Sequence, residues 1–306
     1  MSDFFKQHQQ HGHIPVLPEQ TLGLLDLRPG MTVLDCTVGR GGHGSLILPE
    51  LGSGGHYIGL DVDGGNVDYA RDRLAPLGGR IDLIQSNFIA AKAALSGIGL
   101  EKVDRVIADL GFASNQMDDG QRGFSFQADG PLDMRLDHGN PVTAATLVNT
   151  MNEVELADVI YRFGEERKSR IIAKKIIESR GVKPIKTTAE LASVVCEAIG
   201  RTHTVTGKRI HAATRTFMAL RIAVNAELEV LAALLKLIPQ LVKPSGIAVV
   251  ISFHSLEDRL VKQSFAMLKK QGSGRVLTKK PCVADDHEAR VNPRSRSAKM
   301  RAVQIL

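Results

Sequence analysis

Apolar residues along the chain follow two spacings. Short continuous apolar runs predict strands, and longer segments with an apolar residue at every third or fourth position predict amphipathic helices. In the first part of the chain the two alternate, and strands separated by helices form a mostly parallel sheet with right-handed crossovers. The predicted strands cover residues 32–36, 57–61, 81–84 and 103–109, with two more at 247–253 and 302–306.

The alternation stops in the middle of the chain. Residues 112–140 show no clear period, and residues 141–200 carry only helical patterns, with a capping box at Thr187-Thr188-Ala189-Glu190. A long amphipathic helix is predicted from Thr214 to about Leu237. We therefore predict an α/β domain interrupted by an all-helical insertion. The expected parts are an N-terminal tail at 1–13, a first domain segment at 14–125, the insertion at 126–212 and a second domain segment at 213–306.

Composition narrows the classes of protein that this chain can represent. Of its 306 residues, 43% are hydrophobic and 24% are charged, which excludes wholesale disorder. The sequence has no run of about 18 apolar residues and no signal-peptide pattern, so we expect neither a membrane span nor secretion. Its three cysteines, Cys36, Cys196 and Cys282, lie far apart, which indicates a reducing cytoplasm and no metal site. The net charge of +6 favours a polyanionic partner without proving one.

A glycine-rich segment, Gly39-Arg40-Gly41-Gly42-His43-Gly44, follows the first predicted strand and opens a helix. This spacing is typical of dinucleotide sites and also fits S-adenosylmethionine. Asp35 precedes the loop, where a carboxylate would repel a pyrophosphate but suit a cationic sulfonium, so it favours S-adenosylmethionine. Asp61, at the end of the second strand, would accept the ribose hydroxyls of either cofactor. Phe88, after the third strand, would either stack on adenine or belong to the core.

The fourth strand ends in Asp109-Leu110-Gly111-Phe112, at the edge where open α/β sheets bind their ligands. An acid followed three residues later by an aromatic resembles the Asp-Pro-Pro-Tyr/Phe motif of amino-methyltransferases. An exocyclic amine is a poor nucleophile because its lone pair is delocalised into the base. A carboxylate that accepts its N–H bonds returns electron density to the nitrogen and orients it, while an aromatic ring stacks on the flipped base. The alternative is an aspartate that caps a turn.

Two histidines and two basic segments are further candidates. His43 is interpreted as a loop contact rather than a base, and His254, past the fifth strand, is either a general base or a cap. The basic residues would contact phosphate or lie on a solvated face. In the insertion they are Arg162, Arg167, Lys168, Arg170, Lys174 and Lys175, and near the end of the chain they are Arg290, Arg294, Arg296, Lys299 and Arg301. For the second segment we favour RNA contact or a loop that closes the site.

Seven segments, in order along the chain, carry a resemblance to a known family. They are HIPVL at 13–17, GRGGH at 39–43, RGFSF at 122–126, DGPLDMR at 129–135, ATRTF at 213–217, SFHSLEDR at 252–259 and NPRSRS at 292–297. They closely resemble the ribosomal RNA small subunit methyltransferase H family, over residues 13 to about 301. The resemblance implies a class I S-adenosylmethionine-dependent methyltransferase fold, α/β and Rossmann-like, with a helical insertion that helps shape an RNA groove. It also implies methylation of the 4-amino nitrogen of a decoding-centre cytidine in 16S rRNA.

The resemblance also assigns residues, and at one place the chain departs from the family. The implied cofactor contacts are Gly41, Gly42, His43, Asp61, Phe88, Asp109 and Gln116, which join Asp35 and Gly39 of the loop interpretation. The catalytic candidates are Asp109, Phe112 and Ser114. After the fourth strand the family usually reads Asp-Leu-Gly-Val-Ser-Ser-Pro-Gln, whereas this chain has Phe112, Ala113 and Asn115. A hydroxyl and a rigid φ are thereby lost at the acceptor pocket, so we expect cofactor binding to survive and acceptor identity or rate to be less secure.

Two alternatives stay open on the sequence. One is an amino-methyltransferase that acts on DNA or another RNA, and the other is a cofactor-binding ribosome assembly factor without turnover. The expected partner is 16S rRNA or the small ribosomal subunit, not a membrane. The oligomeric state is open, with a homodimer as one alternative.

Overall fold

The computed structural model describes residues 14–111, 116–117, 119–200 and 211–306. The chain divides into two compact units. Residues 1–111 together with 228–306 form what we call the sheet unit, and residues 112–227 form the helical unit. The sequence pattern places the insertion at 126–212, whereas the compact helical unit begins at residue 112 and ends at residue 227.

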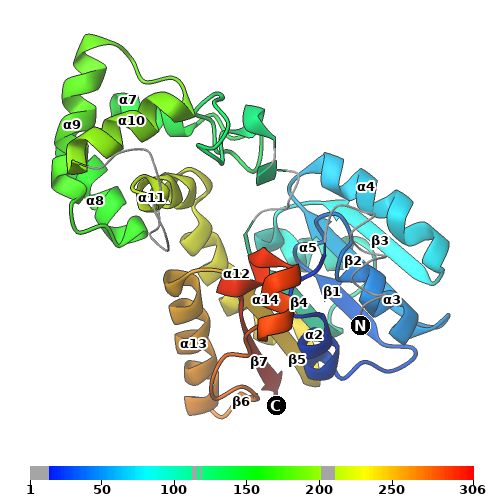
Figure 1. Ribbon diagram of the computed structural model, residues 1–306. Coiled ribbons are helices and arrows are strands. Elements are labelled where there is room, and N and C mark those ends of the chain that lie inside the picture. Colours follow the sequence, from blue (N-terminus) through cyan, green and yellow to red (C-terminus); the bar gives the residue numbers. More distant parts are fainter. Residues whose placement is uncertain (1–13, 112–115, 118, 201–210) are drawn as a thin grey trace. The chain divides into compact units, whose positions relative to one another are not determined.

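The sheet unit is built on a seven-stranded sheet with the strand order β3-β2-β1-β4-β5-β7-β6 (Figure 1). Its first five strands are parallel, and β7 runs antiparallel to β5 and β6. This mostly parallel sheet confirms the predicted Rossmann-like α/β class. The strands are β1 Thr32–Asp35, β2 His56–Asp61, β3 Arg80–Gln85, β4 Val103–Asp109, β5 Val242–Ser252, β6 Gly274–Val276 and β7 Lys299–Ile305.

The order of the strands fixes where a ligand binds. From β1 the chain moves outward through β2 to β3 and then returns to the other side of β1 to form β4. The strand order therefore reverses between β1 and β4, and open α/β sheets bind ligands beyond the carboxyl ends of the strands at such a point. Asp35 ends β1 and Asp109 ends β4, so the two carboxylates flank this position.

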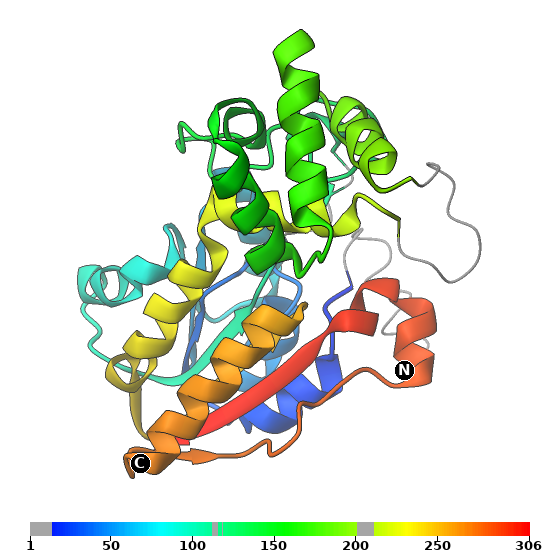
Figure 2. The same ribbon diagram turned by 90° about the vertical axis from the view of Figure 1, so that its left-hand side faces the viewer.

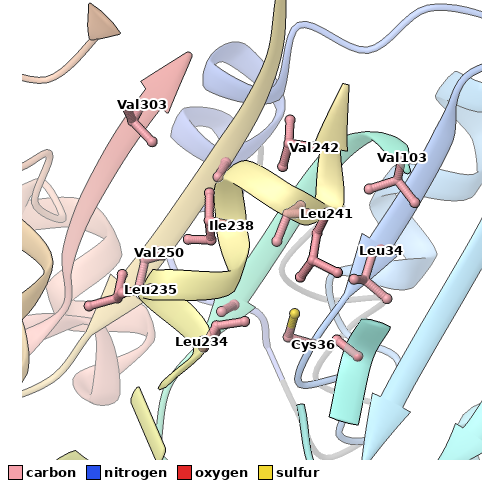
Figure 3. Packing of buried hydrophobic residues seen from close by; sticks show 14 of the residues in the cluster. Leu34, Cys36, Val103, Leu234, Leu235, Ile238, Leu241, Val242, Val250 and Val303 are labelled. Carbon is pink, nitrogen blue, oxygen red and sulfur yellow. The ribbon is translucent and has the colours of Figure 1, made fainter. Parts of the chain in front are cut away.

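Apolar side chains cover both faces of the sheet, which explains why its central strands read as nearly continuous apolar runs. On one face, residues of α5, α12 and α13 pack with Leu34 of β1, Val106 of β4 and Val250 of β5, and Figure 3 shows Leu235, Ile238 and Leu241 in this cluster. On the other face, α2, α3 and α4 pack on Val33, Ile107 and Val249. The views in Figures 1 and 2 show α13 and α2 on opposite sides of the sheet.

The helices and short helical turns of the sheet unit begin and end as follows. They are α2 Pro18–Leu25, α3 Gly44–Leu51, α4 Gly64–Leu74, η1 Ala75–Leu77, η2 Phe88–Ala90, α5 Ala91–Gly97, α12 Glu227–Leu241, α13 Ser255–Lys270, α14 Asp286–Val291 and η4 Pro293–Ser297. The first residue of α12 belongs to the helical unit.

The helical unit has its own apolar core, which Phe217 and Leu220 of α11 share with Leu156 and Ile160 of α8. Helix α10 begins at the predicted capping box: the side chain of Thr187 accepts a hydrogen bond from the backbone N–H three residues on, and Asn152 does the same at the start of α8. Its elements are η3 Gly120–Arg122, α7 Ala144–Thr150, α8 Glu153–Gly164, α9 Ser169–Val182, α10 Thr188–Ile199 and α11 Thr214–Asn225.

The single long helix predicted from Thr214 to about Leu237 is wrong. Ala226 adopts a left-handed conformation with φ 47°, so α11 ends at Asn225 and α12 begins at Glu227. The Asn225 side chain donates to the carbonyls of Met134 and Arg221 and fixes the end of α11. Apolar periodicity continues across Ala226 because a single change in backbone dihedral angles leaves the spacing of the apolar residues almost unaltered.

Candidate cofactor and acceptor site

Three aspartates that the sequence predicts as site residues lie at the carboxyl ends of neighbouring strands in the sheet unit. Asp61 ends β2, Asp35 ends β1 and Asp109 ends β4, in the order β2-β1-β4 across the sheet. The parallel strands bring these ends to one edge of the sheet. The sequence pattern identifies each of these acids separately, by the strand that it ends, and the structure brings the three to one edge of the sheet.

The glycine loop joins β1 to α3 and follows a path that other residues would obstruct. Gly39 and Gly41 have φ values of 50° and 74°, which L side chains rarely adopt. A Cβ at Gly41 would lie 3.1 Å from Cγ of Leu74, and one at Gly44 would lie 2.8 Å from the Tyr57 hydroxyl oxygen. Gly42 is buried, and its carbonyl accepts from the Ser45 hydroxyl at 2.8 Å. The loop is thus pressed onto β2 and α4, which leaves its backbone as the surface for a ligand.

Asp61 holds the loop and has room for a further partner. Its Oδ2 accepts from the backbone N–H of Gly39 at 2.9 Å, and its Oδ1 accepts from that of Asp63 at 2.9 Å. Burial raises the pKa of this carboxyl to about 6. The Asn66 side chain is a third hydrogen-bond partner of this carboxylate. A carboxylate has about four acceptor positions in all, so a ribose hydroxyl can still add to these bonds.

Asp35 is bonded to the protein itself. One of its oxygens accepts from the Tyr57 hydroxyl at 2.7 Å and the other from the backbone N–H of Thr37 at 2.9 Å. Burial raises the pKa of Asp35 above its ordinary value. The Thr37 hydroxyl accepts from the backbone N–H of Asp109 at 2.7 Å, which ties the end of β1 to the end of β4. Asp35 therefore supports the base of the loop, and its contact with a cofactor stays a prediction.

The most informative pair at this edge is Asp109 and His43. Oδ2 of Asp109 lies 3.4 Å from Nε2 of His43, and the two side chains are 17% and 6% exposed. Among the described residues, Oδ1 of Asp109 and both ring nitrogens of His43 are buried and have no hydrogen-bond partner. A buried polar atom without a partner costs about 1–3 kcal/mol, which makes this cluster a candidate place for a ligand to supply the missing bonds.

The other predicted site residues do not all lie at this edge of the sheet. Phe88 is half-buried in η2 and packs against the core on the α5 and α12 face, which leaves both of its interpretations open. Gln116 is buried in the helical unit. Phe112 and Ser114 lie outside the described residues.

His254 is a helix cap, as one of its two interpretations predicted. It is the N-cap of α13, and its Nδ1 accepts from the backbone N–H of Glu257 at 3.4 Å. Glu257 completes the capping box by accepting from the backbone N–H groups of Phe253 and His254 at 2.8 and 3.3 Å. These bonds fix the turn between β5 and α13.

Sequence reasoning missed three residues of the sheet unit that shape this site: Thr37, Tyr57 and Glu288. Thr37 and Tyr57 donate hydrogen bonds to the buried Asp35. A buried carboxylate needs hydrogen-bond donors, and this need was the one indication in the sequence that such residues exist. Glu288 is buried, and one of its carboxylate oxygens accepts from the backbone N–H of Leu17 at 2.7 Å. The indication for Glu288 in the sequence was an acidic residue just before the basic segment that begins at Arg290.

The basic candidates separate into paired and exposed residues. Arg301 was interpreted as part of an RNA footprint, and this is wrong: it is buried in β7, and its Nε donates to Asp258 at 2.7 Å. In the helical unit Lys175 pairs with Glu197 at 3.4 Å. Arg167, Arg170 and Lys174 are exposed: Arg167 lies two residues before α9, and Arg170 and Lys174 lie one turn apart within its first half. No helix of the described ranges has the length and apolar character to cross a membrane.

Comparisons with known proteins give one consistent result. A family model described as the MraW methylase family matches residues 10–306. Proteins called ribosomal RNA small subunit methyltransferase H are similar to this chain: that of Koribacter versatilis is 46% identical over 301 residues, which cover 96% of this chain and 94% of the relative. That of a Cyanothece species is 47% identical over 294 residues, covering 96% and 95%. A solved S-adenosylmethionine-dependent O-methyltransferase from Thermotoga maritima aligns with a TM-score of 0.45 at 9% identity, covering 98% of this chain and 70% of that one.

Proposed function

The chain belongs to the MraW methylase family, and from this premise we propose that it methylates the 4-amino nitrogen of a cytidine in 16S rRNA with S-adenosylmethionine as methyl donor. The observation that carries the proposal is Oδ1 of Asp109, a buried acceptor atom without a partner among the described residues, at the carboxyl end of β4. It belongs to the same ligand-binding edge as the glycine loop.

The residues of the glycine loop and of β2 fit the cofactor. Asp61 would accept the ribose hydroxyls, the backbone at Gly41 and Gly42 would lie against the ligand, and the half-buried Phe88 ring would stack on the adenine. When bound, S-adenosylmethionine supplies a methyl group on a positively charged sulfur. The acids at this edge suit that charge, whereas they would repel the pyrophosphate of a dinucleotide.

Asp109 would prepare the acceptor nitrogen. Its Oδ1 accepts an N–H bond from the amine, which returns lone-pair density to the nitrogen and directs it at the methyl carbon. A nitrogen–carbon bond forms while the carbon–sulfur bond breaks, and the bonding electrons stay on sulfur. The amine loses one proton, which Asp109 Oδ1 accepts and passes to water. Phe112 and Ser114 remain candidates for contacts with the base.

The helical unit would bind the RNA around the target nucleotide. Its exposed basic face, which we define as Arg167, Arg170 and Lys174, offers three phosphate contacts, one just before α9 and two on it. We propose the small ribosomal subunit as the partner that this face recognises. We further propose that the protein acts in the cytoplasm, because its three cysteines are free. A homodimer stays a prediction.

Methyl transfer to small ribosomal subunits that lack the modification tests the proposal. Subunits, naked 16S rRNA and duplex DNA would each be incubated with labelled S-adenosylmethionine, and the product nucleoside would be identified by mass spectrometry. We expect label on the 4-amino nitrogen of one cytidine of the rRNA. Label only on DNA or on another base would show a different acceptor, and cofactor binding without transfer to any substrate would favour an assembly factor.

A further inference from the structure

Two arginines in the C-terminal segment of the sheet unit are exposed and form no ion pair. They are Arg290 of α14 and Arg296 of η4. Neither guanidinium lies within ion-pair distance of a carboxylate in the part of the chain that the structure describes, the neighbouring Asp286 included. Arg301 of the same basic segment is buried and pairs with Asp258. The charge of Arg301 is thus neutralised inside the protein, whereas the charges of Arg290 and Arg296 face solvent.

Buried polar side chains hold this segment in place. The Glu288 carboxylate accepts from the backbone N–H of Leu17 at 2.7 Å, and the Asn292 amide donates to the carbonyl of Ile14 at 3.2 Å. The Ser295 hydroxyl, which is also buried, donates to the carbonyl of Asn292 at 2.8 Å. Because Glu288, Asn292 and Ser295 recur at helical spacing and face the protein, the arginines between and after them face outward.

Both guanidinium groups are anchored to the backbone of α14. Nε of Arg290 donates to the carbonyl of Asp286 at 2.9 Å, and Nε of Arg296 donates to the carbonyl of Ala289 at 3.0 Å. These carbonyls are three residues apart, or about 4.5 Å along the helix axis, so the two groups are held near each other. In each group the two terminal nitrogens form the planar fork that binds two oxygens of one phosphate. The bonds at Nε restrict the side chains before a ligand binds, which lowers the entropy cost of binding.

The strand register places this segment at the ligand-binding edge of the sheet. One residue after η4 the chain enters β7, whose first residue, Lys299, pairs with Ser252 at the carboxyl end of β5 (Figure 2). On its other side β5 pairs with β4, where Ile251 lies opposite Asp109. The two arginines therefore lie beyond the carboxyl ends of the strands, at the edge where the acceptor base would reach Asp109.

We propose that Arg290 and Arg296 form a phosphate clamp, which binds the RNA backbone beside the target cytidine while its base enters the acceptor site. The proposal rests on the proposed function, in which the base reaches Asp109. A base leaves its stack when the nucleotide turns about its backbone, and this step costs unstacking energy. Phosphate contacts carry no sequence information but fix the position of the strand. The clamp would hold the strand in the conformation from which the base is extruded.

The test compares the clamp with an exposed arginine at the opposite edge of the same sheet. Arg275 of β6 forms no ion pair with the described residues, and it pairs with Gln304 beside the amino end of the apolar run of β5. Arg290→Ala, Arg296→Ala and the double variant would be compared with Arg275→Ala. Binding of unmodified small subunits would be measured between 50 and 300 mM salt, together with the rate of a single methyl transfer at saturating subunits. An unchanged affinity for S-adenosylmethionine would show that the variants keep the folded site.

We expect each clamp variant to weaken binding several-fold and to lower the steepness of its salt dependence by about one counterion, and the double variant by about two. The saturated rate of the double variant should fall about tenfold, because the clamp holds the nucleotide after the subunit has bound. Arg296→Lys keeps the charge but not the fork, so it should recover the salt dependence but not the full rate. Wild-type binding in the double variant, an unchanged saturated rate, or equal losses in Arg275→Ala would overturn the proposal.

Hydroxyl-radical footprinting of the RNA in the subunit gives a readout that does not depend on activity. We expect the wild-type protein to protect the backbone beside the target cytidine and the double variant to lose this protection. Weaker binding with unchanged protection of the RNA would indicate a contact with a ribosomal protein and overturns the proposal. Failure of the proposed function would look different, since wild-type protein would then leave cytidine unmethylated whatever the behaviour of the clamp variants.

Discussion

Two motif-rich loop regions, one in each unit, use their polar groups in opposite ways. In the helical unit, Arg135 donates to both oxygens of Asp133 at 2.8 Å and to the carbonyls of His138 and Asn140 at 3.1 and 2.8 Å. Arg122 donates to the carbonyls of Arg135 and Leu136 at 3.2 and 3.1 Å. The charged residues of this region therefore bind the loop to itself.

In the sheet unit, the glycine loop and the end of β4 together leave polar atoms without partners instead. Oδ1 of Asp109 and the ring nitrogens of His43 are buried and have no hydrogen-bond partner among the described residues. Both regions carry segments that resemble the same family, GRGGH at 39–43 and DGPLDMR at 129–135, so the resemblance does not distinguish them. Their bonding does: Arg135 and Asp133 satisfy each other within the helical unit, whereas the buried atoms of Asp109 and His43 have acceptor and donor positions that a ligand would fill.

Replacing the acceptor atom of the glycine-loop region gives the largest expected effect. Asp109→Ala removes the carboxylate that prepares the amine, and we expect the rate of methyl transfer to fall about 1,000-fold, as when a hydrogen-bonding group specific to a transition state is lost. The free energy of unfolding would change little, because Oδ1 of Asp109 makes no bond to the described protein and Oδ2 lies 3.4 Å from Nε2 of His43, too far for a strong hydrogen bond. Rapid-quench kinetics and urea unfolding of the same preparation check both parts. A rate within tenfold of wild type would contradict the role of Asp109.

The reverse outcome is expected in the helical unit. Arg135→Ala leaves Asp133 without its bidentate partner and the carbonyls of His138 and Asn140 without a donor. We expect the free energy of unfolding of the helical unit to fall by about 3 kcal/mol. Urea unfolding measures this loss. Arg135→Lys is the matched variant, which keeps the charge but not the planar fork and should lose an intermediate amount.

The dissociation constant of S-adenosylmethionine should stay at the wild-type value in folded Arg135→Ala. A loss of cofactor affinity with unchanged stability would show that Arg135 belongs to the ligand site, and the contrast between the two regions would fail.

The pH dependence of cofactor binding tests the role of the sheet-unit site in this contrast. Burial raises the pKa of Asp61 to about 6, so below this pH the folded protein carries the protonated carboxyl, which has fewer acceptor positions for ribose hydroxyls. We expect the affinity for S-adenosylmethionine to fall as the pH is lowered through 6, by about tenfold at pH 5. Isothermal titration calorimetry at pH 5, 6 and 7.5 measures this. A flat profile would contradict ribose binding by the ionised form.

The linked effect on stability has the opposite direction and serves as a control. Because the pKa of Asp61 is higher in the folded than in the unfolded chain, the folded state binds the proton more tightly between about pH 4 and 6. The contribution of Asp61 to the stability of the cofactor-free protein therefore decreases as the pH rises through that window. Cofactor binding and stability should respond to the same group with opposite signs.

The sequence predicts the strand ends of the site because short apolar runs and the acids after them are local patterns. It identifies Asp35, Asp61 and Asp109 in this way, and the topology brings them to one edge. What each acid is bonded to depends on distant parts of the chain. Asp35 meets Tyr57 across the neighbouring strand, and Arg301 meets Asp258, which is 43 residues away. The spacing of residues along the chain does not indicate such distant pairs. For this reason the sequence pattern predicted an RNA contact for Arg301 of β7, although it forms a buried ion pair.

The pattern of apolar residues also does not predict local backbone conformation. Alanine has a high helix propensity, yet Ala226 separates α11 from α12 in a left-handed conformation. Side-chain bonds at Asn225 hold this break, because they stabilise the end of α11 against the loop at Met134 and Leu136. Tertiary contacts therefore override the propensity of the residue.

The smallest expected effect concerns the exposed basic face of the helical unit. Lys174→Ala should weaken binding of the small subunit a few-fold and reduce the steepness of its salt dependence by about one counterion, because one phosphate contact is lost. Lys175→Ala is the matched control: Lys175 is the next residue along α9, but it pairs with Glu197 at 3.4 Å. Binding measured between 50 and 300 mM salt would separate the two lysines. An equal slope for wild type and both variants would place the RNA contact on another surface, and a change in Lys175→Ala alone would show that its ion pair opens to bind phosphate.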